Sequence, residues 1–437
     1  MNYKLPHSNL LGTPIDKTKP QIIIGAGISG LYLGYYLKKA KIPFKIIEQS
    51  NYGGGLLQSV QTDYGLTERA ANGFIWCKEI QEISDDLGLE ILAPRPTSKA
   101  RYIVKNKQLR KIPLSFFDGI RLAQAFIKKH QQSFETLQDF GNYFLGEKIA
   151  KQVLEPAFTG IYGAPIDQLS FPGAMSKLAK AFNETSYLRP AFKKMRGKST
   201  PEERKKRAAG THCFKNGMGE LTQRLTEYLK NEIEWNVDGR TLKDEKENLI
   251  LTTPAYVSKD FFQNQSEILY QSLQAVRYNS MISVTAIFPK TAFSKFKKGF
   301  GCLIPKKEGL NILGVLFNSY IFDHRVKSDD LLSLTCILRD DTSDLSKVNQ
   351  PDDWFKDLII KDLDILFGVN ESPVEVTVSR WKNGIPLYSP TLYQNWFGMD
   401  KALKDEFPNR NLFGNYTGEI SVRGLAQSSH NIFKYIK

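Results

Sequence analysis

The chain has 437 residues, of which 41% are hydrophobic and 24% charged, and 60 Lys and Arg against 46 Asp and Glu give a net charge of +14. This composition excludes a disordered, collagen-like or coiled-coil protein, and the length predicts about two or three domains. The positive charge favours an acidic partner, such as anionic lipid or a substrate with several carboxylates, and nucleic acid is not expected because no nucleic-acid motif accompanies the charge.

The cysteines and histidines are scattered, and no CxxC pair occurs. This spacing argues against a zinc site and a disulfide framework, so we expect no metal and a reducing compartment. The first twenty residues lack the apolar core of a signal peptide. The longest uncharged stretch, 20–37, carries four glycines and is better explained by a buried strand, turn and helix than by a membrane span. We therefore expect a cytoplasmic protein, and a peripheral place on the inner face of the membrane stays open.

The chain opens with a predicted βαβ unit. Residues 20–25 are rich in β-branched side chains, as in a strand buried on both faces. Residues 28–40 have a helical period and a basic last turn, and residues 43–48 form a second strand.

The region from about 87 to 210 is predicted to be mainly helical, with helices over 119–129 and 134–145 that are limited by Pro113, Pro156 and Pro172. Its stretch 112–129 is apolar and basic together, which fits a core-facing helix or a helix on an anionic membrane surface equally well. Between Arg189 and Arg207 lies a basic tract, which we expect to be a solvated loop rather than a binding site.

The later part of the chain predicts a helix over 221–231 and a buried strand over 249–253. From about 275 to 381, alternating β-branched runs predict an antiparallel sheet in a second domain.

The first chemical motif, Gly25-Ala26-Gly27-Ile28-Ser29-Gly30, stands between the first strand and helix. In a dinucleotide fingerprint the first glycine permits the tight turn, the second lets a pyrophosphate approach and the third allows close packing, while the helix N-terminus attracts the anion. Glu48 ends the second strand, where an acid binds ribose hydroxyls and disfavours a 2′-phosphate. The expected cofactor-binding residues of this unit are Gly25, Gly27, Ile28, Ser29, Gly30 and Glu48.

Two further glycine-rich segments favour FAD over NAD. Gly54, Gly55 and Leu56 lie in a turn that resembles the GG-x-x-x-S segment of flavin oxidases of the amine oxidase superfamily, although a plain hairpin turn is the alternative. Residues 414–422 (GNYTGEISV) resemble the segment that returns beneath the flavin in that superfamily. This resemblance adds Gly414, Ile420, Ser421 and Val422 to the expected cofactor site.

Longer motifs resemble the protoporphyrinogen oxidase family. They are 144–171 (FLGEKIAKQVLEPAFTGIYGAPIDQLSF), 214–221 (FKNGMGEL), 253–255 (TPA), 300–305 (FGCLIP), 312–319 (ILGVLFNS) with Phe322 and Arg325 in register, and 381–388 (WKNGIPLY). The similarity extends from about Lys19 to Val422. It implies FAD as cofactor and a porphyrinogen that loses a hydride to flavin N5, with oxygen as acceptor and peroxide as product, in heme biosynthesis.

The resemblance also assigns single residues. Arg101 stands where the family has an arginine that pairs with a substrate propionate, which suits an arginine fork, although a surface arginine on a strand is the alternative. Gly160 would lie near the substrate ring. For the cofactor the resemblance assigns Ala71, Asn72 and Gly73 in the flavin loop, Val237 at the adenine, and Trp381.

The sequence departs from the family pattern at four places, one of which is the short segment between Val237 and Leu249, where there is little room for the usual strands. Tyr52 stands for an arginine, Ala70-Ala71 for Gly-Pro, and Glu419 for a glycine. Because the cofactor supplies the chemistry, no catalytic triad is expected, and we name no general base.

The expected fold is α/β + α+β. It has a Rossmann-type FAD-binding domain (1–86, 211–262 and 381–437), a helical substrate- or membrane-binding region (87–210) and an antiparallel-sheet substrate domain (263–380). Protoporphyrinogen and coproporphyrinogen are both open as substrates, and a homodimer is an open oligomeric state. The rival functions are an amine- or polyene-oxidising flavoenzyme of the same fold and a flavin- or tetrapyrrole-binding protein without activity.

Overall fold

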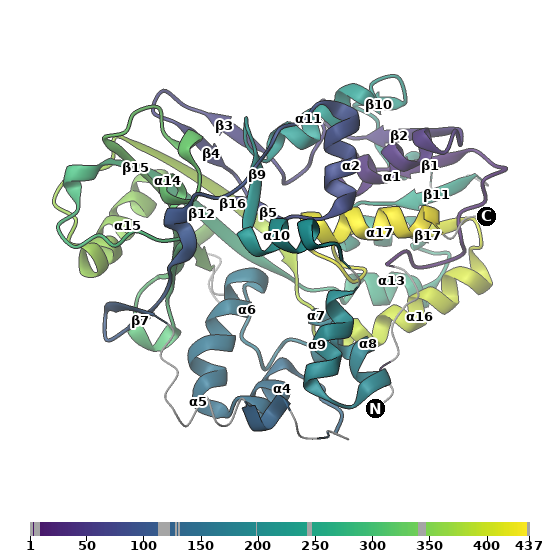
Figure 1. Cartoon of the computed structure of the whole chain (residues 1–437). Helices are drawn as coiled ribbons and strands as arrows, with labels where there is room; N and C mark the ends of the chain where they lie inside the picture. The colour runs from purple at the N-terminus through teal and green to yellow at the C-terminus, as the bar shows by residue number, and fades with distance from the viewer. Residues whose placement is uncertain are drawn as a thin grey trace.

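The computed structural model describes Tyr3, 9–111, 123–126, Lys129, 132–197, 199–242, 247–339 and 347–434. Two main sheets are surrounded by helices (Figure 1). The predicted helix over 119–129 and the stretch 112–129 lie largely outside the described residues. Within these ranges, no helix is long and apolar enough to cross a membrane.

The first sheet is parallel throughout and begins with the predicted βαβ unit. Its order is β10-β2-β1-β11-β17, so three distant chain segments meet in it. The carboxyl ends of its strands therefore share one edge, where open α/β sheets bind ligands. Its elements are β1 (Gln21–Ile24), α1 (Ile28–Lys39), β2 (Phe44–Glu48), β10 (Ile233–Trp235), β11 (Asn248–Leu251) and β17 (Arg410–Leu412).

Helices cover both faces of this sheet, and β1 is therefore buried at every position. Ile23 packs on the side of α1, whereas Ile22 and Ile24 belong to the core on the opposite side. The first side also holds α2 (Lys78–Leu87), α11 (Gly219–Tyr228) and α17 (Val422–Lys434), and the second α13 (Glu267–Gln274) and α16 (Pro390–Glu406) (Figure 1).

The second sheet has seven strands, and the runs predicted between 275 and 381 form five of them. All neighbouring strands are antiparallel except the parallel pair β13–β7. One face is apolar and packs against α15 (Asp352–Phe367). The order is β16 (Glu375–Pro386), β12 (Tyr278–Pro289), β15 (Leu331–Arg339), β14 (Ile312–Leu316), β13 (Gly301–Leu303), β7 (Arg101–Lys105) and β8 (Gln108–Lys111).

Hairpin β7–β8 differs from the predicted helical texture of 87–210. Its two turn residues, Asn106 and Lys107, both have a φ above 50°. A two-residue turn with both φ positive matches the twist of a hairpin. The helical region therefore contributes the edge of the second sheet.

The remaining helices lie mainly below the two sheets in Figure 1. They are α4 (Leu137–Phe144), α5 (Glu147–Ile149), α6 (Glu155–Tyr162), α7 (Phe171–Ala174), α8 (Ser176–Thr185), α9 (Leu188–Arg196) and α10 (Pro201–Ala209), together with α12 (Ala255–Ser258) and α14 (Asn318–Ile321) elsewhere. Short strands β3 (Ser59–Gln61), β4 (Leu66–Glu68), β5 (Phe74–Ile75), β6 (Ile91–Leu92) and β9 (Thr211–Phe214) complete the described structure.

Two predictions in this helical region are wrong. Pro156 does not end a helix, because a π-helical turn (Ala150–Leu154) precedes α6 and relaxes the hydrogen-bond ladder where the ring stands. The basic tract is not a loop along its whole length, because α9 and α10 form most of it on either side of its middle. Thr200 and Glu203 make a capping box that starts α10, and this helix has no buried residue.

A buried ion pair joins β4, in the small β3–β4 sheet, to the 3-10 turn Asp323–Arg325, which lies between β14 and β15 of the second sheet. Arg325 Nη1 lies 2.5 Å from Glu68 Oε1, and the two side chains are 2% and 0% exposed. Arg325 Nη2 donates to the carbonyl of Asn72 at 3.1 Å. The Glu68 carboxylate also accepts from the Met218 N–H and the Ser59 hydroxyl. Both charges are removed from water, so each would destabilise the fold if the opposite charge were absent.

We predict that Arg325→Met lowers the free energy of unfolding by about 3–5 kcal/mol, because it leaves the buried Glu68 carboxylate without its cation. The double variant Glu68→Met/Arg325→Met should lose less than the single one, since no charge is then stranded. Urea and thermal unfolding midpoints measure both. A single variant as stable as wild type would contradict this reading of the pair.

Candidate functional site

The first glycine turn leaves a free space at the N-terminus of α1. Gly25 has a φ of +105°, which favours glycine. A Cβ at Gly30 would clash with the Gly25 carbonyl, so the helix packs tightly on the turn. A Cβ at Gly27 would meet nothing within 4 Å, and Gly27 caps α1 without a side-chain hydrogen bond. The first N–H groups of α1, which begins with Ile28 and Ser29, can therefore bind an anion.

Glu48 is held at the end of β2 beside a pocket. Its Oε2 accepts from the Ala26 N–H at 2.7 Å, and its Oε1 accepts from the N–H and hydroxyl of Ser50. The Val237 N–H donates to the Glu48 carbonyl at 3.0 Å, which places Val237 next to this strand end. The pocket has a volume of about 330 Å³ and is lined by Glu48, Gln49, Ser50, Tyr52 and Gly55.

The second glycine turn lies directly against the first. The Gly54 N–H donates to the Ala26 carbonyl at 2.8 Å, and a Cβ at Gly55 would lie 3.4 Å from the Gly27 Cα. Leu56 follows and is partly exposed, at 37%. The two turns and the Glu48 pocket thus form one continuous surface.

Hydrogen bonds from the second sheet hold the loop after β4 in place. Trp381, on β16, donates its indole N–H to the Arg69 carbonyl at 2.7 Å, and the Arg69 guanidinium lies 5.7 Å from the indole ring centre. Asn72 is held by Arg325, and its side chain accepts from Thr335 at 3.4 Å. A Cβ at Gly73 would lie 2.6 Å from the His212 carbonyl, so glycine is needed there. The loop with Ala71, Asn72 and Gly73 is therefore held between the second sheet and β9.

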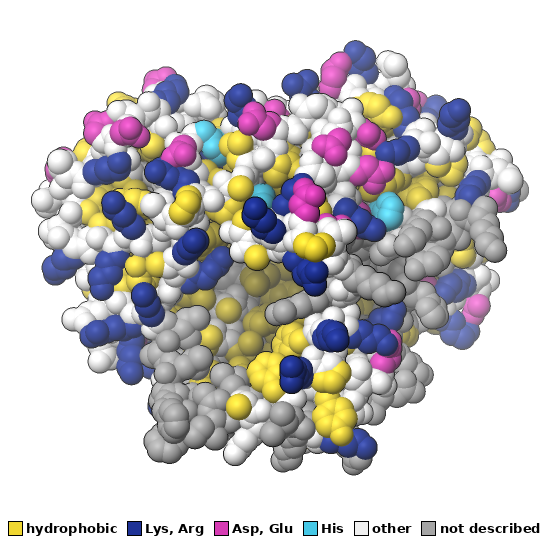
Figure 2. Space-filling view, viewed as in Figure 1, with side chains coloured by type: hydrophobic (Ala, Val, Ile, Leu, Met, Phe, Trp, Pro, Cys, Tyr) yellow, Lys and Arg dark blue, Asp and Glu magenta, His cyan; other side chains and the backbone are white. Residues whose placement is uncertain are grey.

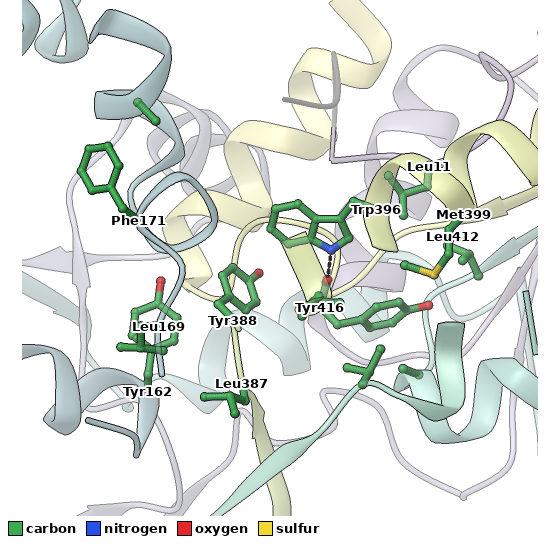
Figure 3. Packing of buried hydrophobic residues seen from close by; sticks show 14 of the residues in the cluster. Leu11, Tyr162, Leu169, Phe171, Leu387, Tyr388, Trp396, Met399, Leu412 and Tyr416 are labelled. Atoms are coloured by element: carbon green, nitrogen blue, oxygen red, sulfur yellow. Dashed lines mark hydrogen bonds between the residues drawn. The ribbon is translucent and has the colours of Figure 1, made fainter. Parts of the chain in front are cut away.

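The C-terminal loop, 413–421, reaches the same edge of the parallel sheet. Gly414 and Gly25 both lie against Thr252, at the end of β11. Trp396 donates its indole N–H to the Tyr416 carbonyl at 2.7 Å (Figure 3). The Tyr388 hydroxyl accepts from the Gly418 N–H and donates to the Asn415 carbonyl. The loop ends with Ile420 and Ser421, and α17 starts at Val422.

The two expected substrate residues, Arg101 and Gly160, both lie next to β13. Arg101 pairs with Gly301 across the β7–β13 ladder, and its guanidinium lies 4.2 Å from the ring centre of Phe300. A Cβ at Gly160 on α6 would lie 3.7 Å from Leu303, two residues along β13.

The Arg101 cation has no ion-pair partner in the described ranges. The Arg101 side chain is exposed at the start of β7, as the surface-arginine alternative expected. Desolvation lowers the pKa of its guanidinium, which stays protonated at neutral pH because the ordinary pKa of arginine is so high. Near α6, Figure 2 shows a hollow with hydrophobic side chains inside it and Lys and Arg side chains at its rim. This combination suits a flat apolar ligand with carboxylates at its edge.

Sequence reasoning did not find the pairing of Glu68 with Arg325, nor the place of Thr252 between the two glycine turns at opposite ends of the chain. Arg325 lies in register with a motif that resembles the family, and Glu68 directly precedes the loop with Ala71, Asn72 and Gly73. A single sequence contains no signal that two residues 257 positions apart are partners.

Comparisons with known proteins agree with this geometry. The family model described as "Flavin containing amine oxidoreductase" matches residues 28–422. Protoporphyrinogen oxidase 2, chloroplastic/mitochondrial, of Arabidopsis thaliana is 26% identical over 92% of this chain and 90% of its own length. Coproporphyrinogen III oxidase of Bacillus subtilis (strain 168) is 22% identical over 90% and 92%. The resemblance found in the sequence is thereby confirmed.

Solved structures are similar in fold. A crystal structure of a protein from Exiguobacterium sp. 255-15 has a TM-score of 0.75 with 17% identity and covers 96% of this chain and 98% of its own. Reduced UDP-galactopyranose mutase has a TM-score of 0.67 with 13% identity, over 95% and 93%. The expected fold class, with a parallel and a largely antiparallel sheet, is confirmed, but a fold shared with a mutase does not by itself determine the chemistry.

We predict that Gly27→Leu leaves the fold intact but lowers the flavin content of the purified protein at least about tenfold, because the side chain would enter the space that a pyrophosphate needs. Gly398→Leu is the matched control, since Gly398 also faces open space but lies on α16. Absorbance at the flavin bands and thermal unfolding of both variants measure the effect. Equal flavin content in the two variants would contradict the assignment.

Proposed function

Because the chain belongs to the flavin containing amine oxidoreductase family and is an FAD-dependent oxidoreductase, we propose that its substrate is a porphyrinogen-type tetrapyrrole. Oxygen is the proposed electron acceptor and hydrogen peroxide the second product. The observation that carries the proposal is the Arg101 cation on β7, which has no ion-pair partner among the described residues and lies next to β13, the strand that Gly160 approaches. The names of the relatives from Arabidopsis thaliana and Bacillus subtilis support it.

The proposed cofactor site uses backbone more than side chains. The N-terminus of α1 would hold the pyrophosphate, Glu48 the ribose hydroxyls and Val237 the adenine side, while the loop fastened by Trp381 would flank the ring system. The full set of proposed cofactor residues is Gly25, Gly27, Ile28, Ser29, Gly30, Glu48, Gly54, Gly55, Leu56, Ala71, Asn72, Gly73, Val237, Trp381, Gly414, Ile420, Ser421 and Val422.

On the substrate side, the chain would bind, orient and exclude water. FAD supplies the hydride-accepting chemistry when it is bound. Arg101 would pair with one substrate carboxylate and thereby set the orientation of the ring. Gly160 would let the flat ring approach α6, since a side chain there would fill the space beside Leu303. The apolar hollow would keep the oxidisable bridges away from water.

The proposed function is tested by aerobic turnover. The flavin-loaded protein is mixed with protoporphyrinogen, coproporphyrinogen, or a panel of amines and polyenes, and porphyrin fluorescence and peroxide are followed. We expect fluorescence and peroxide to rise together with at least one porphyrinogen and no turnover of the amines or polyenes. The flavin-poor Gly27→Leu protein corrects for spontaneous oxidation. Turnover of an amine or polyene alone, or no turnover above that correction, would reject the proposal.

We predict that Arg101→Met lowers kcat/KM for the porphyrinogen by about 10- to 100-fold, mainly through KM, because a charge-assisted hydrogen bond contributes about 1.5–3 kcal/mol. Arg101→Lys should recover only part of the loss, since it lacks the bidentate fork. Arg110→Met is the control, because Arg110 is an exposed cation on the neighbouring strand β8. Equal kinetics of Arg101→Met and Arg110→Met would remove Arg101 from the substrate site.

A further inference from the structure

The N-terminal segment, defined as Tyr3 and residues 9–15, contacts both the helical region and the parallel sheet. Tyr3 lies among the helices and is 9% exposed. Its hydroxyl accepts from the Phe134 N–H at 2.7 Å, and its ring packs edge-on against Phe171 of α7, with the ring centres 5.6 Å apart. Its backbone N–H and carbonyl both bind the side-chain amide of Asn183 on α8, each at 2.7 Å. All polar groups of Tyr3 are therefore bonded, which indicates a specific contact rather than a loose chain end.

The other end of this segment is bound to the parallel sheet. Leu11 is completely buried and exchanges two backbone hydrogen bonds with Leu412 of β17, at 2.9 and 3.0 Å. The Gly12 N–H donates to the Asp400 carboxylate on α16 at 2.9 Å. Gly12 has a φ of +114°, and a Cβ there would lie 2.8 Å from the Arg410 carbonyl, so this close approach to β17 requires glycine.

Between these two anchors, Asn9 lies against the C-terminal loop, 413–421. Its side-chain amide donates to the Ser428 hydroxyl on α17 at 2.5 Å. Its side-chain oxygen would lie 2.6 Å from a Cβ at Gly418, so Asn9 packs directly on the backbone of the loop. Gly418 in turn donates its N–H to the Tyr388 hydroxyl. One short segment therefore contacts the helical region, the C-terminal loop and the sheet.

The parts that this segment contacts also meet inside the molecule. Ala174 ends α7, and its carbonyl accepts from the Tyr162 hydroxyl on α6 at 3.3 Å. The ring centres of Tyr162 and Tyr388 are 5.5 Å apart, and the Tyr388 hydroxyl holds the C-terminal loop (Figure 3). The contacts thus form a closed series, from Tyr3 through α7, α6 and Tyr388 to the C-terminal loop and back to Asn9.

We propose that the N-terminal segment is a clamp that sets the distance between α6, on the proposed substrate side, and the C-terminal loop, on the proposed cofactor side. The inference rests on the proposed function, because a substrate at α6 reacts only at the correct distance from the cofactor. Reacting atoms must lie about 3–3.5 Å apart, and a displacement of about 1 Å lowers a rate by about 10²-fold. Tyr3 and Asn9 are positioning residues in this role, since neither belongs to the proposed cofactor or substrate set.

The test compares flavin-loaded wild type with Tyr3→Ala, Tyr3→Phe, Asn9→Ala and the double variant Tyr3→Ala/Asn9→Ala. The control is Tyr64→Ala, which changes an exposed tyrosine between β3 and β4. The first readout is hydrogen exchange of α7 and α8, with α1 as the internal reference, and it needs no turnover. The second readout is the rate at which saturating porphyrinogen bleaches the flavin without oxygen. If Tyr3→Ala does not fold, Tyr3→Phe carries the comparison.

We expect Tyr3→Ala to speed exchange in α7 and α8 at least about tenfold, because these helices lose the buried ring of Tyr3 and the Phe134 N–H loses its acceptor. Exchange in α1 and the flavin content should stay as in wild type. The saturating bleaching rate should fall by about 10- to 100-fold, whereas Arg101→Met acts mainly on KM. Tyr3→Phe keeps the ring and should show the same changes to a smaller extent.

The double variant tests whether the two contacts act as one clamp. Release of either end already frees α6 from its fixed distance to the C-terminal loop. Tyr3→Ala/Asn9→Ala should therefore bleach no more than about twofold more slowly than the slower single variant, whereas independent local effects would multiply.

Each failure has a separate meaning. A wild-type flavin that no porphyrinogen bleaches rejects the proposed function, and hydrogen exchange alone then decides whether Tyr3 holds the helices. Exchange and bleaching in Tyr3→Ala and Tyr3→Phe that match those of Tyr64→Ala reject the clamp. Faster exchange with an unchanged bleaching rate rejects the positioning role and leaves Tyr3 as a stabilising contact only. Multiplied losses in the double variant reject a single clamp.

Discussion

The ion pair between Glu68 and Arg325 is the constraint on which the site depends. It connects β4, the strand before the proposed flavin loop, to the turn between β14 and β15 in an environment without solvent, and Arg325 also binds the carbonyl of Asn72 in the loop itself. Coulomb attraction is strong there, but so is the cost of removing either partner. Trp381, on β16 of the second sheet, adds another contact to the same loop through the Arg69 carbonyl.

The two sheets divide the work. The parallel sheet presents glycine turns, a helix N-terminus and Glu48 at one edge, all of which suit a dinucleotide and none of which is reactive. The second sheet supplies Arg101 and β13, which α6 approaches, and so it faces the proposed substrate. FAD carries the redox chemistry, which explains why the sequence shows no triad.

The parts of the structure that sequence reasoning predicted are those determined by neighbouring residues. The Gly25–Gly30 turn, its flanking strands and Glu48 follow from local steric and periodic rules, and the structure has them within a residue or two. Hairpin β7–β8 was missed because its strands are short and its turn is Asn-Lys rather than Asn-Gly. The helix end predicted at Pro156 was wrong because a π-helical turn precedes the proline and avoids the usual clash between its ring and the preceding helical turn. The ion pair between Glu68 and Arg325 depends on long-range packing, which local sequence patterns do not contain.

The measurement that tests the central claim most directly is the absorbance spectrum of the flavin-loaded protein, recorded without oxygen before and after a porphyrinogen is added. The proposed function predicts that the flavin band bleaches on addition and returns with air, while porphyrin fluorescence appears in proportion. A flavin band that both protoporphyrinogen and coproporphyrinogen leave unchanged would contradict it, and would favour another substrate or a binding protein on the same fold.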